Sequence, residues 1–303
     1  LGVPLTAEVW INDITLRDPY RNRGYAHRLT AAVNFADLLS INGDYRMVDA
    51  EFHSLGVSTG TGTTTTKYSA GATLNLDRFT PPTWGWAMPA TYAWNRTLGE
   101  PSFRPNSDVR VTGEDSWFQR SDESAWNTSV QWRRSIRSEG LTGRYFLDPW
   151  TLRHTMGEKR GFSPSASDSV ENERFTVDYS LNLGRMRLFR LPILEDFRLR
   201  PTRFKFGVNF QRWRDVRWDV SGEDTVQTRH DTQRELTTDG SVGFNFWKGN
   251  TLSYSLLVGR DLYHPWNPDG LSLNVGRETS RNQSLSAAQE MNLWSYLIPR
   301  VSF

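Results

Sequence analysis

The sequence predicts an all-β protein: an antiparallel up-and-down meander of the kind that forms the wall of a transmembrane β-barrel. Three observations support this. Long segments alternate apolar and polar residues, aromatic residues make up 13% of the chain, and mean hydropathy is nevertheless −0.60. No window approaches the run of about 18 apolar residues that a transmembrane helix needs. Barrel strands expose only alternate side chains to lipid, so such a sequence is hydrophilic on average.

The first strand pair runs through residues 24–47 and turns at Asp37-Leu38. Its alternate positions are apolar or small: Tyr25, His27, Leu29, Ala31, Val33 and Phe35, and then Leu39, Ile41, Gly43, Tyr45 and Met47. The positions between them are mostly polar. Each arm is as long as the roughly nine to eleven tilted residues with which a strand crosses a bilayer. Period-two alternation over this length predicts two β-strands.

Similar patterns predict the remaining strands in chain order. These are expected at 7–16, 67–76, 84–97, 125–137, 174–183, 203–213, 236–247, 251–260 and 291–303. Lys248-Gly249-Asn250 joins two of them as a tight hairpin. Long polar connections are expected near 48–66, 98–124, 154–173, 214–235 and 261–290.

Connection lengths predict one strand more. Connections are short at 37–38 and 77–83 but long at 48–66 and 98–124, as in outer-membrane barrels. Short connections should all lie at one end of the sheet and long ones at the other. The tight turn at 248–250 lies at the end with the short connections only if a further strand crosses at about Gly143–His154, entered by a turn at 138–140. We predict that strand, although its own alternation is poor. Residues 7–16 already read as a strand and no signal peptide precedes them, so we expect an internal piece of a longer protein.

Two glycine motifs predict no chemistry. Gly56-Val57-Ser58-Thr59-Gly60 matches the nucleophile elbow, but that motif requires a helix after the serine, and a threonine-rich run follows here. Gly60-Thr61-Gly62 lacks the third glycine and the helix of a phosphate-binding loop.

Candidate metal and acid–base residues are equally inconclusive. There is no Cys, and the five His show no metal-ligand spacing: His27, His53, His154, His230 and His264. Three acidic pairs could supply a glycosidase dyad but are expected as solvated loop charge: Glu114-Asp115, Asp122-Glu123 and Glu195-Asp196. Six tryptophans favour an interfacial girdle or packing over a sugar platform: Trp84, Trp86, Trp94, Trp126, Trp132 and Trp294. We therefore expect no enzyme, no catalytic, cofactor or metal site, and, with net charge +2 and no charge blocks, no nucleic-acid partner.

The opening stretch carries a family resemblance. Residues 8–16, EVWINDITL, resemble the E-V-W-x-N-E-L-R-L segment of the SprA (Sov) family, and Asp37 and Leu39 to Tyr45 match the turn and strand that follow it. Later segments match in the same order: 76–81, 88–92, 101–108, 134–136 and 194–201. Each motif is weak by itself, and their order is the specific feature.

The resemblance implies a very large barrel of which residues 1–303 are one wall segment of about ten to twelve strands. It also implies the outer-membrane translocon of type IX secretion, associated with gliding motility. Its expected partners are the lipid bilayer, other translocon subunits and folded cargo proteins bearing a type IX C-terminal signal. Two alternatives stay open from the residues alone: a self-contained porin-like barrel and a secreted carbohydrate-binding β-sandwich.

Overall fold

The computed structural model describes most of the chain. The described residues are 23–57, 60–104, 107, 109–112, 116–183, 189–190, 198–221, 224–245, 250–263, 276–290 and 300–302. The predicted strand at 7–16 lies outside them. Of the predicted strand at 291–303, only 300–302 is described, and it is extended.

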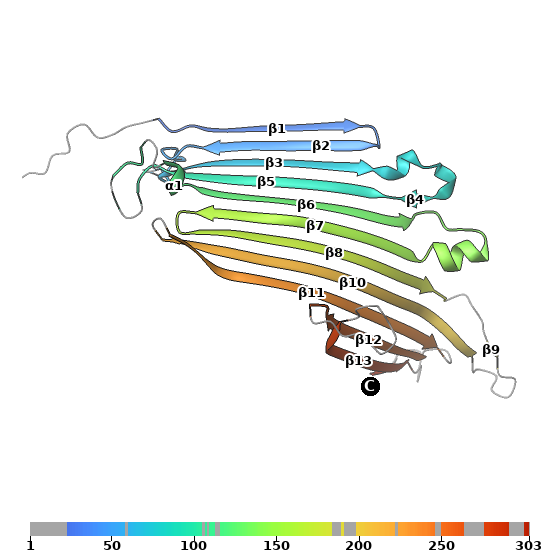
Figure 1. Ribbon diagram of the computed structural model, residues 1–303. Coiled ribbons are helices and arrows are strands. Elements are labelled where there is room, and N and C mark those ends of the chain that lie inside the picture. Colours follow the sequence, from blue (N-terminus) through green and yellow to red (C-terminus); the bar gives the residue numbers. More distant parts are fainter. Residues whose placement is uncertain are drawn as a thin grey trace, which may run out of the picture.

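The described strands form one antiparallel sheet in which nearly every strand pairs with its neighbours in the chain (Figure 1). The path comprises β1 (Ala26–Phe35), β2 (Leu39–Val48), β3 (Thr63–Asn75), β5 (Pro89–Pro101), β6 (Ser121–Arg134), β7 (Trp150–Ser163), β8 (Ala166–Asn182), β10 (Arg198–Ser221), β11 (Asp224–Asn245), β12 (Asn250–Asp261), β13 (Arg277–Glu290) and β14 (Arg300–Ser302). Two short strands lie off it: β4 (Trp86–Ala87) pairs with β6, and β9 (Phe189–Arg190) pairs with β10. The predicted all-β meander is confirmed.

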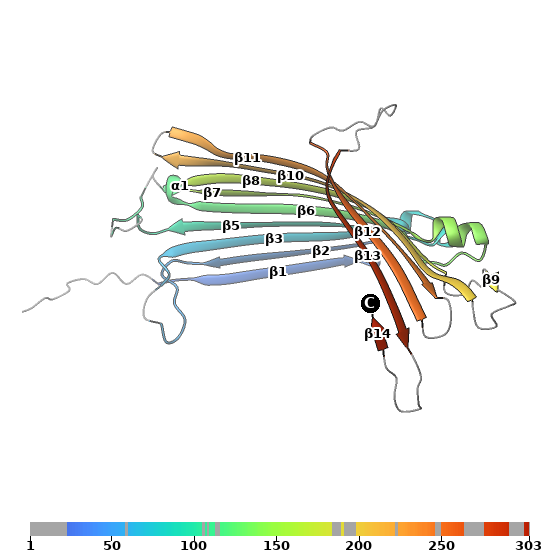
Figure 2. The same cartoon turned by 90° about the horizontal axis from the view of Figure 1, so that it is seen from below.

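The sheet twists strongly and does not close. From β1 to β11 the strand direction changes gradually, and β12 and β13 run steeply across it (Figure 2). Such twist accumulates from the right-handed twist of each strand. Among the described strands β1 pairs only with β2, so no described strand covers its other edge.

The described residues form no hydrophobic core. Only Ala50, Val216 and Val258 are buried hydrophobic residues among them. The accessible surface is 23157 Å², whereas a compact monomer of 34.9 kDa exposes about 13,000 Å². Both faces of this single sheet are therefore uncovered.

Three predicted connections are wrong. Within 154–173, β7 and β8 pair throughout and turn at Pro164-Ser165. Within 214–235, β10 and β11 continue as paired strands on both sides of 222–223. Within 261–290, residues 277–290 form β13. Most residues of these segments are polar, so the alternation that reveals a strand is largely missing, although Val216, Trp218 and Val220 do alternate with charged residues. Backbone hydrogen bonds still pair the segments.

The additional strand exists but is displaced from its predicted position. Residues 143–147 form the π-helical turn η4 (Gly143–Leu147), and the strand is β7, which begins at Trp150. The expected alternation of short and long connections fails after β6. The turn at 164–165 lies at the same end of the sheet as the long connections 49–62 and 102–120, which we call the β2–β3 end. The longer connection 135–149 lies at the opposite, β1–β2 end.

Helical structure among the described residues is confined to single turns. Besides η4 these are η1 (Leu76–Phe79), η2 (Pro82–Trp84) and α1 (Ser116–Gln119). None of the described helices has the length and apolar character needed to cross a membrane.

Candidate functional site: the two faces of the sheet

The strand register sorts the side chains into two chemically different faces. Residues directly opposite each other in an antiparallel pair point to the same face. One such row runs through Val33, Ile41, Ala72, Tyr92, Thr128 and Met156. The row one residue away runs through Ala32, Asn42, Gly71, Ala93 and Asn127. We call the face of the first row the apolar face and that of the second the polar face.

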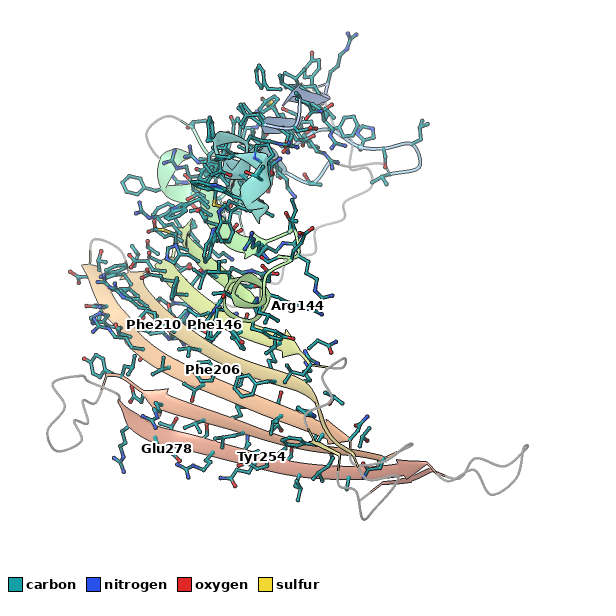
Figure 3. All side chains as sticks on the ribbon, turned by 90° about the vertical axis from the view of Figure 1, so that its right-hand side faces the viewer. Arg144, Phe146, Phe206, Phe210, Tyr254 and Glu278 are labelled. Atoms are coloured by element: carbon teal, nitrogen blue, oxygen red, sulfur yellow. The ribbon has the colours of Figure 1, made fainter. Side chains whose placement is uncertain are left out.

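The apolar face carries a continuous band of exposed hydrophobic side chains. Its exposed members are Leu29, Val33, Phe35, Ile41, Tyr92, Val130, Met156, Phe175, Phe204, Phe206, Tyr254 and Leu285. Phe206, Phe210 and Tyr254 mark this face in Figure 3. Leu29 and Leu285, near the two edges of the sheet, are each 67% exposed. Exposed apolar surface of this extent marks contact with another protein or with a membrane.

Aromatic rings border the band at both ends. At the β2–β3 end, Tyr45 and Tyr68 have ring centroids 5.2 Å apart, and Tyr68 and Trp94 6.4 Å apart. At the β1–β2 end, Trp86 and Trp132 stack at 4.6 Å. Trp150 and Tyr179 lie 5.0 Å apart in the same border. Aromatic side chains in these positions are typical of the two interfaces of a membrane barrel.

The polar face consists largely of small hydroxyl and amide side chains. Cross-strand hydrogen bonds join Thr91 to Ser129 at 2.8 Å and Ser253 to Ser286 at 2.6 Å. Near Gly71 this face is hollowed to about 510 Å³, between β2 and β6. A Cβ built at Gly71 would lie 2.6 Å from Asn42 Oδ1, so glycine keeps the hollow open. The face is wettable, and most of its side chains are small and uncharged.

On the apolar face, charged residues begin where the apolar band ends. At the β2–β3 end Arg96 makes a bidentate ion pair with Asp122, with Nε–Oδ1 at 2.9 Å and Nη2–Oδ2 at 2.6 Å. The hydrogen bonds from Arg96 lower the pKa of the Asp122 carboxyl, against a smaller opposing effect of burial. This pair lies one pleat beyond Trp94 and Trp126, outside the band.

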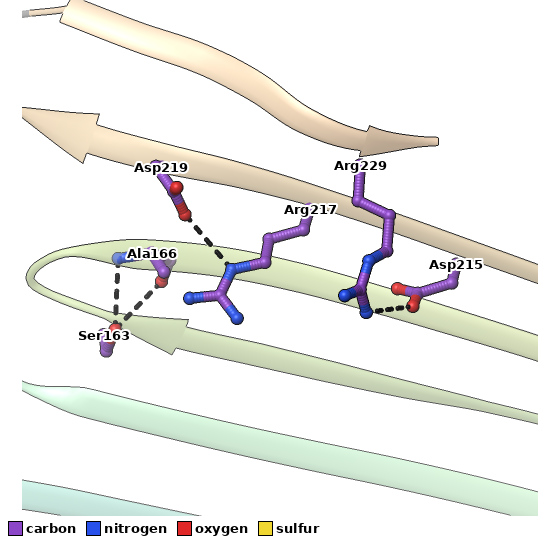
Figure 4. Close-up of polar contacts among 6 residues, drawn as sticks. All are labelled: Ser163, Ala166, Asp215, Arg217, Asp219 and Arg229. Carbon is purple, nitrogen blue, oxygen red and sulfur yellow. Dashed lines mark hydrogen bonds and ion pairs between the residues drawn. The ribbon is translucent and has the colours of Figure 1, made fainter. Parts of the chain in front are cut away.

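A second group of ion pairs lies on the polar face near the turns at the same end of the sheet (Figure 4). Asp215 is 7% exposed and accepts a hydrogen bond from Arg229 Nη1 at 3.0 Å. Arg217 Nε donates to Asp219 at 3.1 Å. The hairpin from β7 to β8 is closed by Ser163 Oγ, which lies 3.1 Å from both the nitrogen and the oxygen of Ala166.

The predicted candidate residues do not assemble into a catalytic or metal site among the described residues. Ser58 lies outside the described residues, and β3, a strand rather than a helix, follows at Thr63. No group of three or more His, Asp or Glu close enough to hold a metal occurs within the described ranges. His27 contacts the Tyr45 ring at 5.5 Å, and His154 Nε2 lies 3.2 Å from Glu173 Oε1. His264 is outside the described residues.

Of the three acidic pairs, only Asp122-Glu123 lies within the described residues, and its position differs from the prediction. Asp122 and Glu123 were predicted in a loop but lie in β6, where they point to opposite faces and pair with Arg96 and Lys159. Glu114-Asp115 and Glu195-Asp196 lie outside the described residues, as does Trp294. Trp94 and Trp126 of the remaining tryptophans lie in the aromatic border on the apolar face.

An unclosed antiparallel meander with one apolar and one polar face defines the structural class: an all-β sheet compatible with a segment of a large barrel wall. Residues 2–113 match the SprA_N family, described as a motility related/secretion protein. Residues 2–113 are thus similar to the SprA/Sov family, as the opening motifs indicate, and this similarity supports a function related to motility or secretion. A comparison with curated proteins gives no match.

Proposed function

We propose that this chain forms part of the wall of the outer-membrane, protein-conducting translocon of type IX secretion. The main support is the separation of the sheet into an apolar band and a polar face. Lipid would contact the band, and the polar face would line the conduit. The match to a motility and secretion family supports the same direction.

The mechanism that fits these faces is passive. Small side chains such as Ser129 and Asn127 hydrate readily and offer few attachment points to a passing protein. Folded cargo with a type IX C-terminal signal would pass along this face, and other translocon subunits would close the openings. Neither step needs covalent chemistry, so we propose a conduit and not an enzyme.

The two alternative functions find less support in the described strands. A self-contained porin would pair its first and last strands, but β1 pairs only with β2 along the described part of the chain. A carbohydrate-binding sandwich requires a second sheet about 10 Å away. The described strands of the main path form one sheet only.

Single cysteines can test the proposal, because this chain has none of its own. Ala93→Cys places a thiol on the polar face, and Ala72→Cys places one on the apolar face of the adjacent strand. In the complete barrel in its native membrane, we expect cargo stalled in transit to crosslink to Ala93→Cys and not to Ala72→Cys. Crosslinking through Ala72→Cys, or through neither position while cargo is stalled, would refute a conduit along the polar face.

A further inference from the structure

Three successive rows of side chains cross the apolar face where its band ends, at the β2–β3 end. The outermost apolar row is Phe175, Phe210 and Leu236. The next is Glu173, Arg212 and Arg234, and the third is Glu171, Arg214 and Thr232. Successive rows are two residues apart, or about 6.7 Å along a strand. Arginines thus lie one pleat beyond the exposed Phe175 and the half-buried Phe210 on the same surface.

Two of these arginines face each other without a neutralising partner. Arg212 of β10 lies directly opposite Arg234 of β11. Like charges in this position destabilise a strand pair. Glu173 flanks Arg212 on the other side, but its carboxylate lies 3.2 Å from His154 Nε2. Within the described part of the chain, neither arginine side chain forms an ion pair or a hydrogen bond.

The same two strands contain a second facing pair that is fully neutralised. Arg217 lies opposite Arg229, on the polar face. Arg217 binds Asp219 at 3.1 Å, and Arg229 binds Asp215 at 3.0 Å (Figure 4). Each arginine of this facing pair on β10 and β11 therefore has its own carboxylate. The facing pair on the apolar face of the same two strands has none, which leaves its charge available to an anion from outside the chain.

A hollow of about 240 Å³ adjoins Arg212 and Arg214. It is lined by Trp126, Met156, Glu158, Glu171, Glu173, Arg212 and Arg214. Glu158 is already occupied, because it accepts hydrogen bonds from Arg160, Trp126 and Ser169. Glu171 lies opposite Arg214 and also interacts electrostatically with Arg160, so it does not offset the charges of Arg212, Arg214 and Arg234 together. The hollow is several times the roughly 30 Å³ share of one water molecule.

We propose that Arg212, Arg214 and Arg234 bind the headgroup phosphate of a phosphorylated membrane lipid. The lipid's acyl chains would lie along Phe175, Phe210 and Leu236, one pleat closer to the band centre. Guanidinium groups bind phosphate by paired, charge-assisted hydrogen bonds. The inference rests on the proposed function in one respect, that the apolar face meets lipid.

The test is a titration of the complete, detergent-solubilised barrel with dihexanoyl-phosphatidic acid, dihexanoylglycerol and inorganic phosphate. Arg212→Gln/Arg234→Gln should weaken binding of the phosphatidic acid about tenfold or more, because each charge-assisted hydrogen bond contributes measurably. Arg174→Gln/Arg217→Gln is the matched control. It removes the same charge from exposed arginines of β8 and β10 on the polar face, and affinity should change less than twofold.

Each comparison can overturn the proposal. Equal affinity of wild type and the Arg212/Arg234 variant for the phosphatidic acid would refute the site. An equal loss of affinity in the Arg174/Arg217 control would show that net charge, and not these two arginines, determines binding, which would also refute the site. Binding of dihexanoylglycerol as tight as that of phosphatidic acid would show that the phosphate is not recognised. Equally tight inorganic phosphate would identify a free-anion site. Flotation of wild type with liposomes measures membrane association separately. If wild type does not float, the proposed function fails; if wild type floats but the two variants bind the phosphatidic acid equally, only the phosphate site fails.

Discussion

The difference between the two faces predicts opposite responses to the same substitution. Ala72 and Ala93 lie on adjacent strands, β3 and β5, but on different faces. Ala72 is flanked across the strands by Ile41 and Tyr92, whereas Ala93 is flanked by Gly71 and Asn127. Changing either one to arginine adds the same atoms and the same charge. Only the environment of the added side chain differs: under the proposed function, lipid at Ala72 and water at Ala93.

The expected magnitude follows from the depth of Ala72 in the band. Ala72 is four residues from Tyr68 of the aromatic border, about 13 Å along the strand. With a strand tilt of about 40°, this is about 10 Å of depth in an apolar band about 25 Å tall, which is close to its middle. An arginine on the lipid face at the midplane costs about 2–4 kcal/mol. On the polar face the cost of Ala93→Arg should stay within about 0.5 kcal/mol.

Urea unfolding of the complete barrel in phosphatidylcholine vesicles, followed by tryptophan emission, measures both costs. Ala72→Arg should lower the free energy of unfolding by about 2–4 kcal/mol relative to wild type. Ala93→Arg should leave it nearly unchanged. If Ala93→Arg is as costly as Ala72→Arg, or more so, the assignment of the apolar face to lipid is wrong.

Two further predictions concern the ends of the sheet and its strand spacing. The pKa of Asp122 is lowered by Arg96, so the pair's stabilisation is present above the carboxyl's ordinary pKa and is lost as pH falls through the lowered one. Acid titration of unfolding should show this loss in wild type and not in Arg96→Gln. A Cβ at Gly157 would lie 2.7 Å from the Trp126 carbonyl oxygen, so Gly157→Ala should cost about 1–3 kcal/mol by urea unfolding. Gly43→Ala, whose nearest atom is 3.8 Å away, should not destabilise.

The sequence predicted the parts of the strands that lie in the band and missed the parts beyond it. Along Leu29 to Phe35, or along Phe204 to Phe210, one face is apolar and the other polar, so period two is visible. Beyond the aromatic border most residues on both faces are polar, apart from Val216, Trp218 and Val220 of β10. The segments 154–173 and 214–235 therefore lost their alternation although their backbone ladders continue. Strand pairing that depends on backbone hydrogen bonds does not require a particular pattern of side chains, so the sequence does not reveal it.

The proposed phosphate site was beyond sequence analysis for a related reason. Arg212 and Arg214 are visibly alternate, but nothing local places Arg234 opposite Arg212. That neighbourhood depends on the β10–β11 register, and the sequence had assigned the turn region to a long loop. The contrast with Arg217 and Arg229, which the fold neutralises, likewise exists only once the register is known.

The edge of β1 that no described strand covers bears on the proposed role. Its ten residues contain one charged side chain that can blunt an edge, Arg28, and no proline, and its pairing with β2 shows no bulge. Soluble proteins protect edges of this length, because an unpaired ladder recruits other strands. The described sheet has no core, an apolar band on one face and an edge that no described strand covers. Under the proposed function, lipid would cover the band and further strands would extend the ladder. Destabilising substitutions should accordingly depend on face and depth along the strands, and should not cluster around any single residue.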